Sequence, residues 1–470
     1  MTSRVLGLWV LSLGLAASAR AVSVTGADWV IHYNLPDQSS TIGSATADEY
    51  AIRDALVARI NALQAGQTSI LATYTFSGSN TIAGGAGAIV NAMSDALDRG
   101  ATVKFVVGRD VNTNDLNGGT NSLASLGRRG VNPLVLVQDD SAAGIMHDKL
   151  GLFDYGPSNR WVFIASWNFT GAASSEQWNT ALEARNDALH AAYLLEMKEL
   201  LAGRFHEDPA KSHAHDGSGF RLNGSWDGSW VRFAPCANGS NALTDITNLM
   251  HRAEDEIVFA LNQVTRPLVQ SQLVAAANRG VRIHGVIPQS DWYAPYSIYP
   301  ALTNPASYLT TNVVHIVAPY SRADGSTYDS GEPDLVHEKW MVIDPWGLRP
   351  VVIHGSANWT AAALTSTSDN DENLVFIRHR ELARIFYAQF KRMTGTWTNR
   401  ADFWCDLDRT NGTWRVSLWT TDTNEFTIEQ ASCLTTSWSA WTRGATGCVG
   451  RVAFTTNLTD SSGFFRARRK

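Results

Sequence analysis

The feature that most constrains this chain is a short motif that occurs twice, 190 residues apart. Each copy has a His, a Lys two residues later and an Asp five residues after the Lys. The two copies are His147, Lys149 and Asp154, and His337, Lys339 and Asp344. Residues two apart on a strand point to the same face, so we expect the His and Lys of each copy to project together. Each copy therefore places an imidazole beside a fixed positive charge.

A second pattern follows each motif at the same distance. Ser166 and Ser356 lie 19 residues after the His of their motif, and Asn168 and Asn358 lie 21 residues after it. A single motif of this kind can arise by chance, but two copies with equal offsets are very hard to explain that way. We therefore interpret the chain as an internal repeat, which has to be settled before the rest of the fold.

The segments before the two motifs also correspond. Helices and strands are predicted in turn at 48–63, 69–76, 88–98 and 103–107 in the first half, and at 241–253, 256–261, 268–278 and 281–287 in the second. In both halves an Arg-Gly pair follows the second helix, where Gly suits a left-handed helix stop. This alternation predicts an α/β layer fold with helices on both faces of each sheet.

The remaining segments differ in composition from the two halves. Residues 1–21 have a short basic start, an apolar stretch and a small-residue cleavage site, which predicts a signal peptide and a secreted or periplasmic protein. The halves are expected at 28–205 and 229–396, joined by a linker, 206–228, that reads as a solvated polar loop. Residues 398–470 contain short alternating runs without a helical period, which predicts a small β-rich module.

Charge and cysteine content bear on the class of protein. The formal net charge of −6 gives no general attraction to polyanions, although a local basic cleft stays compatible with it. Four cysteines in an exported chain indicate disulfides. Cys433 with Cys448 would close a short loop and leave Cys236 with Cys405, and the two other pairings stay open.

The paired motifs resemble the duplicated catalytic signature of the phospholipase D superfamily, over roughly residues 28–396. The resemblance implies two α/β/α sandwich halves related by a pseudo-twofold axis, with one active site where the motifs meet. It does not specify the substrate, because members of the superfamily cleave phospholipids, cardiolipin, nucleic acids or other phosphodiesters.

The resemblance also implies a role for each motif residue. One His attacks phosphorus to form a covalent phosphohistidine, and the other protonates the leaving alkoxide and then activates water. We assign His147 as the nucleophile and His337 as the general acid/base, but the symmetry of the sequence leaves the reverse assignment open. The phosphate clamp is assigned to Lys149, Lys339, Asn168 and Asn358, with hydroxyls or backbone geometry from Ser166 and Ser356, while Asp154 and Asp344 complete the motif or fix strand ends. No metal or other cofactor is expected, since the lysines supply the positive charge.

A nucleophilic His works best when a carboxylate orients its other ring nitrogen. In the second half Glu372, which precedes Asn373, is predicted to orient His337. The first half departs from this pattern. Either Glu176 is the counterpart, which we favour, or the pair Trp178-Asn179 replaces it.

Three functions are compatible with these residues. The first is an exported, monomeric phospholipase D that hydrolyses glycerophospholipids, with aromatic loops at 291–293 and 345–347 as a peripheral membrane contact. The second is an exported, metal-independent nuclease of the same superfamily. The third is a binding protein that keeps the fold, which the intact His and Lys of both halves disfavour.

Overall fold

The structure is a computed structural model of the whole chain. It describes residues 23–34, 49–77, 87–111, 123–141, 144–175, 177–206, 208–212, 215–236, 241–288, 297–303, 314–317, 335–365, 370–393, 403–410, 413–420, 425–431, 439–445, 450–456 and 464–469. The chain divides into two compact units. One is Val22–Thr398, and the other contains Asn399–Lys470 together with Met1–Ala21.

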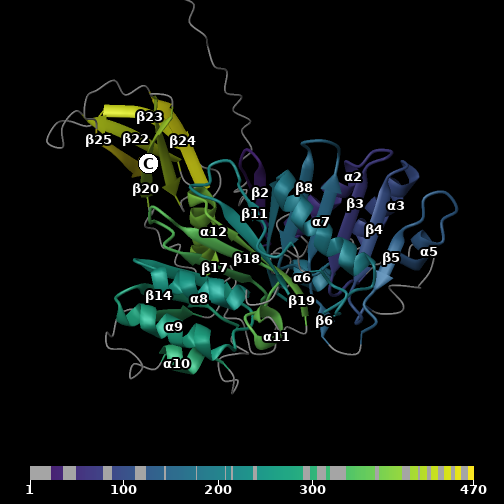
Figure 1. The fold of residues 1–470 in the computed structure, drawn as a ribbon. Coiled ribbons are helices and arrows are strands. Elements are labelled where there is room, and N and C mark those ends of the chain that lie inside the picture. Colours follow the sequence, from purple (N-terminus) through teal and green to yellow (C-terminus); the bar gives the residue numbers. More distant parts are fainter. Residues whose placement is uncertain are drawn as a thin grey trace, which may run out of the picture. The chain divides into compact units, whose positions relative to one another are not determined.

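The first half of the larger unit is an eight-stranded mixed sheet in the order β1-β2-β10-β8-β7-β3-β4-β5 (Figure 1). In that order the strands span Ser23–Thr25, Trp29–Tyr33, Thr180–Arg185, Arg160–Ala165, Leu150–Asp154, Thr68–Thr73, Thr102–Val107 and Val135–Gln138. The last three strands run parallel to one another, and the other neighbours are antiparallel. The helices described in this half are α2 (Ala51–Asn61), α3 (Gly87–Asp98), α5 (Leu123–Gly127), α6 (Gly171–Ser175) and α7 (Asp187–Leu201).

The second half repeats this strand order as β11-β12-β19-β18-β17-β13-β14-β15. These strands span Gly219–Phe220, Ser229–Ala234, Asn370–Ile377, Val351–Gly355, Lys339–Ile343, Glu256–Leu261, Arg282–Val286 and Val314–Val317. The helices described are α8 (Ala242–Arg252), α9 (Pro267–Asn278), α10 (Tyr299–Thr303), α11 (Ala361–Leu364) and α12 (Arg380–Met393). The predicted α/β fold class with two related halves is confirmed, and the predicted helices and strands before each motif lie within a few residues of the observed ones.

The apolar runs in the sequence explain why the central strands form. All six residues of β13 are buried, as are five of the six in β3. A strand covered on both faces needs a nearly continuous apolar run rather than an alternating one. Each half has its own hydrophobic core, into which its helices and strands pack. The motif strands β7 and β17 lie in the middle of these sheets, so their backbone is well supported.

Two short strands cross between the halves. β6 (Ile145–Met146), just before the first motif, pairs with the start of β19 in the second half. β16 (Leu335–Val336), just before the second motif, pairs with β9 (Gln177–Trp178) of the first half. Each motif His is therefore held by a strand of the opposite half, which brings the two motifs together.

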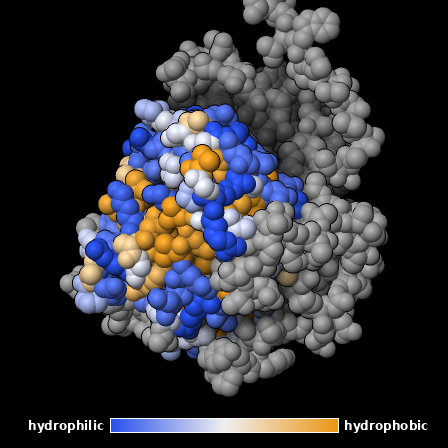
Figure 2. All heavy atoms as spheres, turned by 90° about the vertical axis from the view of Figure 1, so that its right-hand side faces the viewer, coloured by the Kyte–Doolittle hydropathy of each residue, from blue (hydrophilic) through white to orange (hydrophobic). Residues whose placement is uncertain are grey.

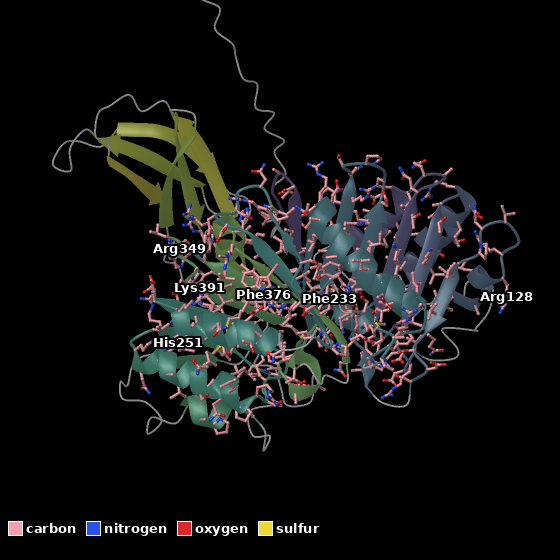
Figure 3. The ribbon with its side chains drawn as sticks, viewed as in Figure 1. Arg128, Phe233, His251, Arg349, Phe376 and Lys391 are labelled. Carbon is pink, nitrogen blue, oxygen red and sulfur yellow. The ribbon has the colours of Figure 1, made fainter. Side chains whose placement is uncertain are left out.

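Aromatic packing also joins the halves. Tyr193 of α7 meets Phe233 of β12 edge to face, with ring centroids 5.0 Å apart. Within the second half, Phe376 of β19 stacks on Trp230 of β12, with centroids 4.9 Å apart. Figure 3 labels Phe233 and Phe376 where they project from their strands. These contacts bury the strands that carry the pairing partners of the motifs.

The second unit contains six described strands after residue 402. They form two three-stranded antiparallel sheets, β20-β21-β24 and β23-β22-β25. The strands are Phe403–Thr410, Thr413–Thr420, Glu425–Ala431, Ser439–Ala445, Gly450–Thr456 and Phe464–Arg469 for β20 to β25. The predicted β-rich character of this part of the chain is confirmed.

The remaining expectations concern the cysteines and the N-terminal segment. Cys236 is a buried free thiol, so its expected disulfide with Cys405 is not formed. Cys433 and Cys448 lie outside the described residues, as does the predicted signal segment. Among the described residues, no helix combines the length and the apolar character that crossing a bilayer requires.

The outer edge of the first half carries exposed apolar side chains. Figure 2 shows apolar residues gathered on the side of the molecule where β5 is the edge strand. Val131 and Val135, before and at the start of this strand, are 91% and 43% exposed. β5 lies at one end of the sheet, three strands beyond β7, so this surface is separate from the motifs.

Candidate active site

The backbone of each motif His is anchored to the opposite half. The N–H of His147 donates to the carbonyl of Asp371 at 2.9 Å, and the N–H of His337 donates to the carbonyl of Trp178 at 3.0 Å. Both imidazoles are nearly buried, with exposed fractions of 5% and 7%. The positive charges of both motif lysines act on each imidazole. The predicted meeting of the two motifs is therefore what the structure shows.

Glu372 contacts the imidazole of the first motif rather than that of the second. Its Oε1 lies 2.7 Å from Nδ1 of His147, and Ser356 Oγ donates to its Oε2 at 2.7 Å. The prediction that Glu372 orients His337 is wrong. The cause is the pairing of β6 with β19, which places the strand carrying Glu372 beside the motif of the other half.

His337 has an amide partner in place of a carboxylate. Its Nδ1 lies 3.0 Å from Oδ1 of Asn179, while Asn179 Nδ2 donates to the carbonyl of Ala173 and Ser166 Oγ donates to Oδ1. These two bonds fix the amide so that its oxygen faces the ring. Trp178-Asn179 thus replaces the carboxylate pair, and Glu176 lies outside the described residues.

The same reasoning fixes the tautomer of both rings. Each Nδ1 faces an acceptor oxygen, so it carries the proton when the ring is neutral. The side-chain partner of each ring contacts Nδ1, and the backbone of Ser356 and of Ser166 also acts on the rings of His147 and His337. Both rings therefore present an unprotonated Nε2, but one is supported by a carboxylate and the other by a neutral amide.

The two motif lysines are fully buried. Each Nζ donates to the carbonyl of the His in its own motif, at 2.7 Å for Lys149 and 3.0 Å for Lys339. Burial lowers the pKa of Lys149 to about 7, and burial together with the charge of Lys149 lowers the pKa of Lys339 well below its usual range. Burial and the two lysine charges also hold the pKa of both imidazoles low. An anion bound between them would relieve this repulsion, so the site favours a negatively charged ligand.

The residue between His and Lys in each motif is an acid that sequence reasoning passed over. Asp148 accepts a hydrogen bond from Asn373 Nδ2 at 2.5 Å, and Glu338 accepts from Thr180 Oγ1 at 2.9 Å. Both carboxyls are fully buried, and burial raises their pKa, to about 8 for Asp148 and about 7 for Glu338. Adjacent strand residues face opposite sides, so these acids lie behind the imidazoles rather than among the substrate groups.

The motif serines hold the partners of the imidazoles. Ser166 and Ser356 are fully buried, and each hydroxyl accepts a backbone N–H, from Thr180 at 3.1 Å and from Asn373 at 3.0 Å. Each hydroxyl also donates to the side chain that contacts the opposite His, namely Asn179 or Glu372. Both serines therefore act on the histidines through Asn179 and Glu372.

Asn168 and Asn358 have buried amide oxygens that make no hydrogen bond within the described ranges. Each follows the strand that neighbours its motif strand, β8 in the first half and β18 in the second. An unpaired buried amide is costly unless a ligand or water completes it. Both side chains therefore remain available to a bound group.

Asp154 and Asp344 lie at the far ends of β7 and β17 from the lysines. Asp154 accepts from the Gly156 backbone at 3.0 Å, and its Oδ2 lies 3.1 Å from Arg160 Nε. Asp344 accepts the backbone N–H groups of residues 254 to 256 at 2.8–3.2 Å. The structure thus gives these carboxylates the strand-end role and places them apart from the imidazoles.

Tyr74 is a neighbour of the first motif that sequence reasoning missed. Its ring centroid lies 5.1 Å from that of His147, and Lys149 Nζ lies 5.6 Å from it. Its hydroxyl donates to Asp110 at 2.6 Å. Isolated β-bridges join residues 76 and 169 in the first half and residues 264 and 359 in the second. Asn262, two residues before the second bridge, is therefore the equivalent of Tyr74, two residues before the first. Among the described residues, an aromatic ring therefore packs against His147 but not against His337.

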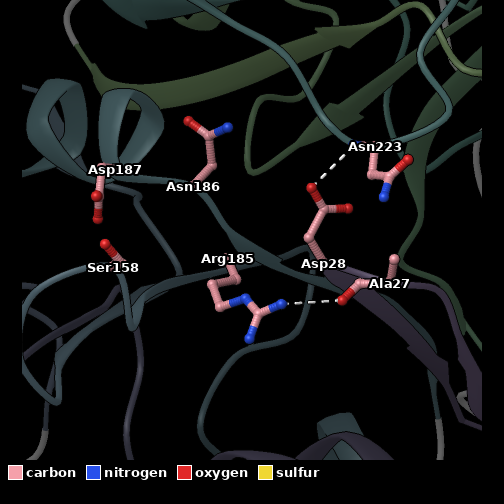
Figure 4. Close-up of a pocket in the computed structure, with 7 residues that line it drawn as sticks. All are labelled: Ala27, Asp28, Ser158, Arg185, Asn186, Asp187 and Asn223. Carbon is pink, nitrogen blue, oxygen red and sulfur yellow. Dashed lines mark hydrogen bonds between the residues drawn. The ribbon is translucent and has the colours of Figure 1, made fainter.

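A surface hollow lies elsewhere on the first half. It is lined by Ala27, Asp28, Ser158, Arg185, Asn186, Asp187 and Asn223 (Figure 4). Arg185 donates to the Ala27 carbonyl, and Asp28 accepts from the backbone of Asn223. None of the predicted site residues lines it. His251, at the end of α8, is also exposed and apart from the motifs (Figure 3).

Comparison with known proteins agrees with this fold and site. The family described as "Cardiolipin synthase, PLD-like domain" matches residues 56–201 and 246–394, one match in each half. These ranges cover more than half of the chain. The fold and the paired His-Lys sites define a two-half phosphodiesterase or phosphotransferase. The chain belongs to the phospholipase D-like family.

Individual relatives share less of the chain. A Rickettsia felis protein named phospholipase D is 28% identical over 141 residues, which are 30% of this chain and 58% of the relative. The aligned region thus spans less than two thirds of that relative. The phosphatidylserine synthase of Haemophilus influenzae has a TM-score of 0.52 at 10% identity, covering 79% of this chain and 87% of that one, which shows a shared fold. Nuc, a phospholipase D family member from Salmonella typhimurium, is 23% identical with a TM-score of 0.26, covering 35% of this chain and 92% of that one.

Proposed function

We propose that this protein hydrolyses glycerophospholipids to phosphatidic acid and a free alcohol through a covalent phosphohistidine on His147. The observation that carries the proposal is the unequal support of the two rings. A buried carboxylate, Glu372, contacts His147, whereas an amide, Asn179, contacts His337.

The carboxylate favours His147 as the nucleophile. A carboxylate on Nδ1–H raises electron density at Nε2 and stabilises the positive charge that develops on the ring when Nε2 bonds to phosphorus. The amide on His337 stabilises an imidazolium less, so protonated His337 is the stronger acid. The two imidazoles then differ in acid strength, as a nucleophile and a general acid must.

The reaction proceeds in two displacements. The negative charge of the bound phosphodiester offsets the two lysine charges, so His337 can carry a second proton, on Nε2, in the substrate complex. Nε2 of His147 then attacks phosphorus, the bond from phosphorus to the leaving alcohol oxygen breaks, and His337 gives its Nε2 proton to that oxygen. Water then attacks phosphorus, His337 takes a proton from the water, and the bond between phosphorus and His147 breaks. Phosphatidic acid leaves, and both rings return to their starting states.

Four side chains bind the phosphate of the substrate. Lys149 and Lys339, one from each half, supply positive charge to the non-bridging oxygens. Asn168 and Asn358 supply amide groups. Because the charge comes from lysines, the reaction is expected to continue when divalent metals are chelated.

Several features support a lipid substrate and an exported, monomeric enzyme. The R. felis relative carries the name phospholipase D. The net charge of −6 gives no general attraction to nucleic acid. Both motifs lie in one chain, so a second copy is not required to complete a site. The N-terminal signal pattern suits secretion. Of the two aromatic loops expected at a membrane, 291–293 lies outside the described residues, and in 345–347 the ring of Trp346 packs on Tyr387, with centroids 5.3 Å apart, and on Arg384.

The test uses purified mature protein in EDTA on phosphatidylcholine vesicles and, separately, on plasmid DNA. We expect choline release that disappears in His147→Ala and His337→Ala. Nicking of DNA without choline release would replace the proposal by the nuclease alternative. Absence of both activities in the wild type would remove the proposed reaction.

A further inference from the structure

The segment that joins the two halves is buried where it meets the first motif. His206, Lys211 and His215 have exposed fractions of 6%, 5% and 2%. The expectation of a solvated polar loop is therefore wrong for these residues. The reason is charge: three buried carboxylates from other elements, Asp139, Glu196 and Asp371, contact them.

Two of those carboxylate residues hold the backbone immediately around the first catalytic His. Asp139 Oδ2 accepts the N–H of Met146 at 3.1 Å, and the carbonyl of Asp371 accepts the N–H of His147 at 2.9 Å. Asp139 follows β5 of the first half, and Asp371 lies in β19 of the second, next to Glu372. The dipeptide Met146-His147 is thus fixed from both halves at once.

The linker neutralises both of these residues. The His206 ring lies 3.2 Å from Asp139 through Nε2 and 3.0 Å from Asp371 through Nδ1, and its backbone N–H donates to Asp371 at 2.9 Å. Lys211 Nζ donates to Asp371 at 2.6 Å. Burial alone would lower the pKa of His206, but its contacts with the two carboxylates outweigh burial and raise it to about 9. His206 is therefore a cation at neutral pH, placed between two anions.

The second motif has no such arrangement in the described parts of the chain. The residue equivalent to Asp371 is Trp178, whose carbonyl accepts the N–H of His337 but whose side chain is an indole. The charged support therefore exists around His147, the ring that also has a carboxylate partner.

We propose that His206 and Lys211 act as a clamp that positions the nucleophile, by neutralising Asp139 and Asp371 and so fixing the backbone of Met146-His147 against Glu372. This inference rests on the proposed function of His147. His206 and Lys211 are positioning residues, because they act on the reacting ring only through other groups.

The test variant is His206→Gln, and its matched control is His215→Gln. Both histidines are buried in the linker and pair with a carboxylate, but the partner of His215 is Glu196, which holds no backbone of the motif. Glu196 reaches the clamp only through its ion pair with Lys211, which His215→Gln leaves in place. A displacement of a reacting group by about 1 Å can cost about 100-fold in rate. We expect His206→Gln to lower kcat by about 10- to 100-fold with KM within about threefold, and His215→Gln to lower kcat by less than about threefold.

A second readout does not depend on turnover. Hydrogen exchange of the Met146 and His147 amides is expected to speed up at least about tenfold in His206→Gln and to stay unchanged in His215→Gln. If His206→Gln does not fold, Ser141→Ala replaces it. Ser141 Oγ lies 2.6 Å from both His206 Nε2 and Asp139 Oδ1, so its loss loosens the clamp more gently. For this variant we expect about a threefold fall in kcat and faster exchange at the same two amides.

The outcomes separate the inference from the proposed function. Two results overturn the clamp while leaving the phospholipase activity intact. One is an equal loss of kcat in His206→Gln and His215→Gln. The other is wild-type kcat and wild-type amide exchange in His206→Gln or in its replacement, Ser141→Ala. An inactive wild type overturns the proposed function instead. In that case the exchange rates alone still decide whether the linker fixes the His147 backbone.

Discussion

Replacing Glu372 with Gln isolates the charge that distinguishes the two catalytic rings. The substitution keeps the size of the side chain but removes the carboxylate 2.7 Å from Nδ1 of His147. Glu372 is 1% exposed, so water cannot substitute for it. The variant gives His147 the same kind of neutral partner that His337 already has.

The size of the effect follows from the geometry. A hydrogen bond to a charged group contributes about 1.5–3 kcal/mol, which corresponds to about 10- to 150-fold in rate. If the Gln presents its NH₂ group to Nδ1, the ring is held in the wrong tautomer, and losses of about 10⁴-fold have been seen for such a change in a catalytic triad. We expect phosphoenzyme formation to slow by at least about 50-fold, with KM within about threefold because the phosphate-binding lysines are untouched.

The assay is single-turnover release of p-nitrophenolate from bis(p-nitrophenyl) phosphate by rapid mixing. The matched control is Glu338→Gln. Glu338 is as deeply buried as Glu372 and its pKa is raised to about the same value, but its described partners are Ser166, Thr180 and Gln389. We expect the control to slow the reaction by less than about fivefold. Equal losses in both variants, or a rate for Glu372→Gln within about fivefold of wild type, refute the reasoning.

Four further predictions follow from the site. First, His337→Ala is expected to lose choline release from lipid yet keep much of its first-turnover release of p-nitrophenolate, since that leaving group departs without a proton; equal losses of the two first-turnover rates contradict the acid role. Second, Tyr74→Leu is expected to lower kcat about tenfold and Tyr74→Phe by less than about threefold, measured by steady-state kinetics, because the ring packs on His147; a larger loss in Tyr74→Phe contradicts this. Third, kcat/KM for a diester monoanion is expected to fall as pH rises through about 7, because the pKa of Lys149 lies at about 7 in the free protein and only its charged form binds phosphate; a rise over this range is the contrary result. Fourth, Asp344→Ala is expected to lower the free energy of unfolding by about 1–3 kcal/mol in denaturant titration, since three backbone N–H groups lose their acceptor, while kcat of the folded protein stays unchanged.

The repeat explains why much of the fold could be predicted. Local patterns determine that β13 is an apolar run and that an Arg-Gly pair ends α3 and α9. Such signals lie within a few residues of one another, so the sequence contains them in readable form. Equal offsets in two places then indicate a common strand order, which the two sheets have.

The pairing of Glu372 could not be predicted in the same way. It depends on β6 crossing to β19, a contact between residues more than 220 positions apart. Sequence symmetry suggests a partner in the same half, and only the crossing strands reveal the exchange. The departure of the first half was a signal, because Trp178-Asn179 stands where the second half has Asp371-Glu372.

The linker was misjudged for a related reason. Gly, Ser, Asp and His are typical of solvated loops, so composition predicts exposure for residues 206–228. The composition does not show that Asp371, distant in sequence, presents a buried carboxylate to His206 and Lys211. Nor does it show that Glu196, in the preceding helix α7, presents one to His215. Burial of a charged residue is decided by its partner, and that partner lies elsewhere in the chain.

The most direct measurement is to trap the covalent intermediate and locate it. The protein is mixed with a short-chain phosphatidylcholine, quenched in alkaline denaturant within one turnover, and digested for mass spectrometry. We expect a phosphatidyl group on His147 of the wild type and none on His147→Ala. With a p-nitrophenyl ester as the substrate, we expect more of the modified protein in His337→Ala. A modified His337 in the wild type, or continued turnover by His147→Ala, would contradict the central claim that His147 is the nucleophile.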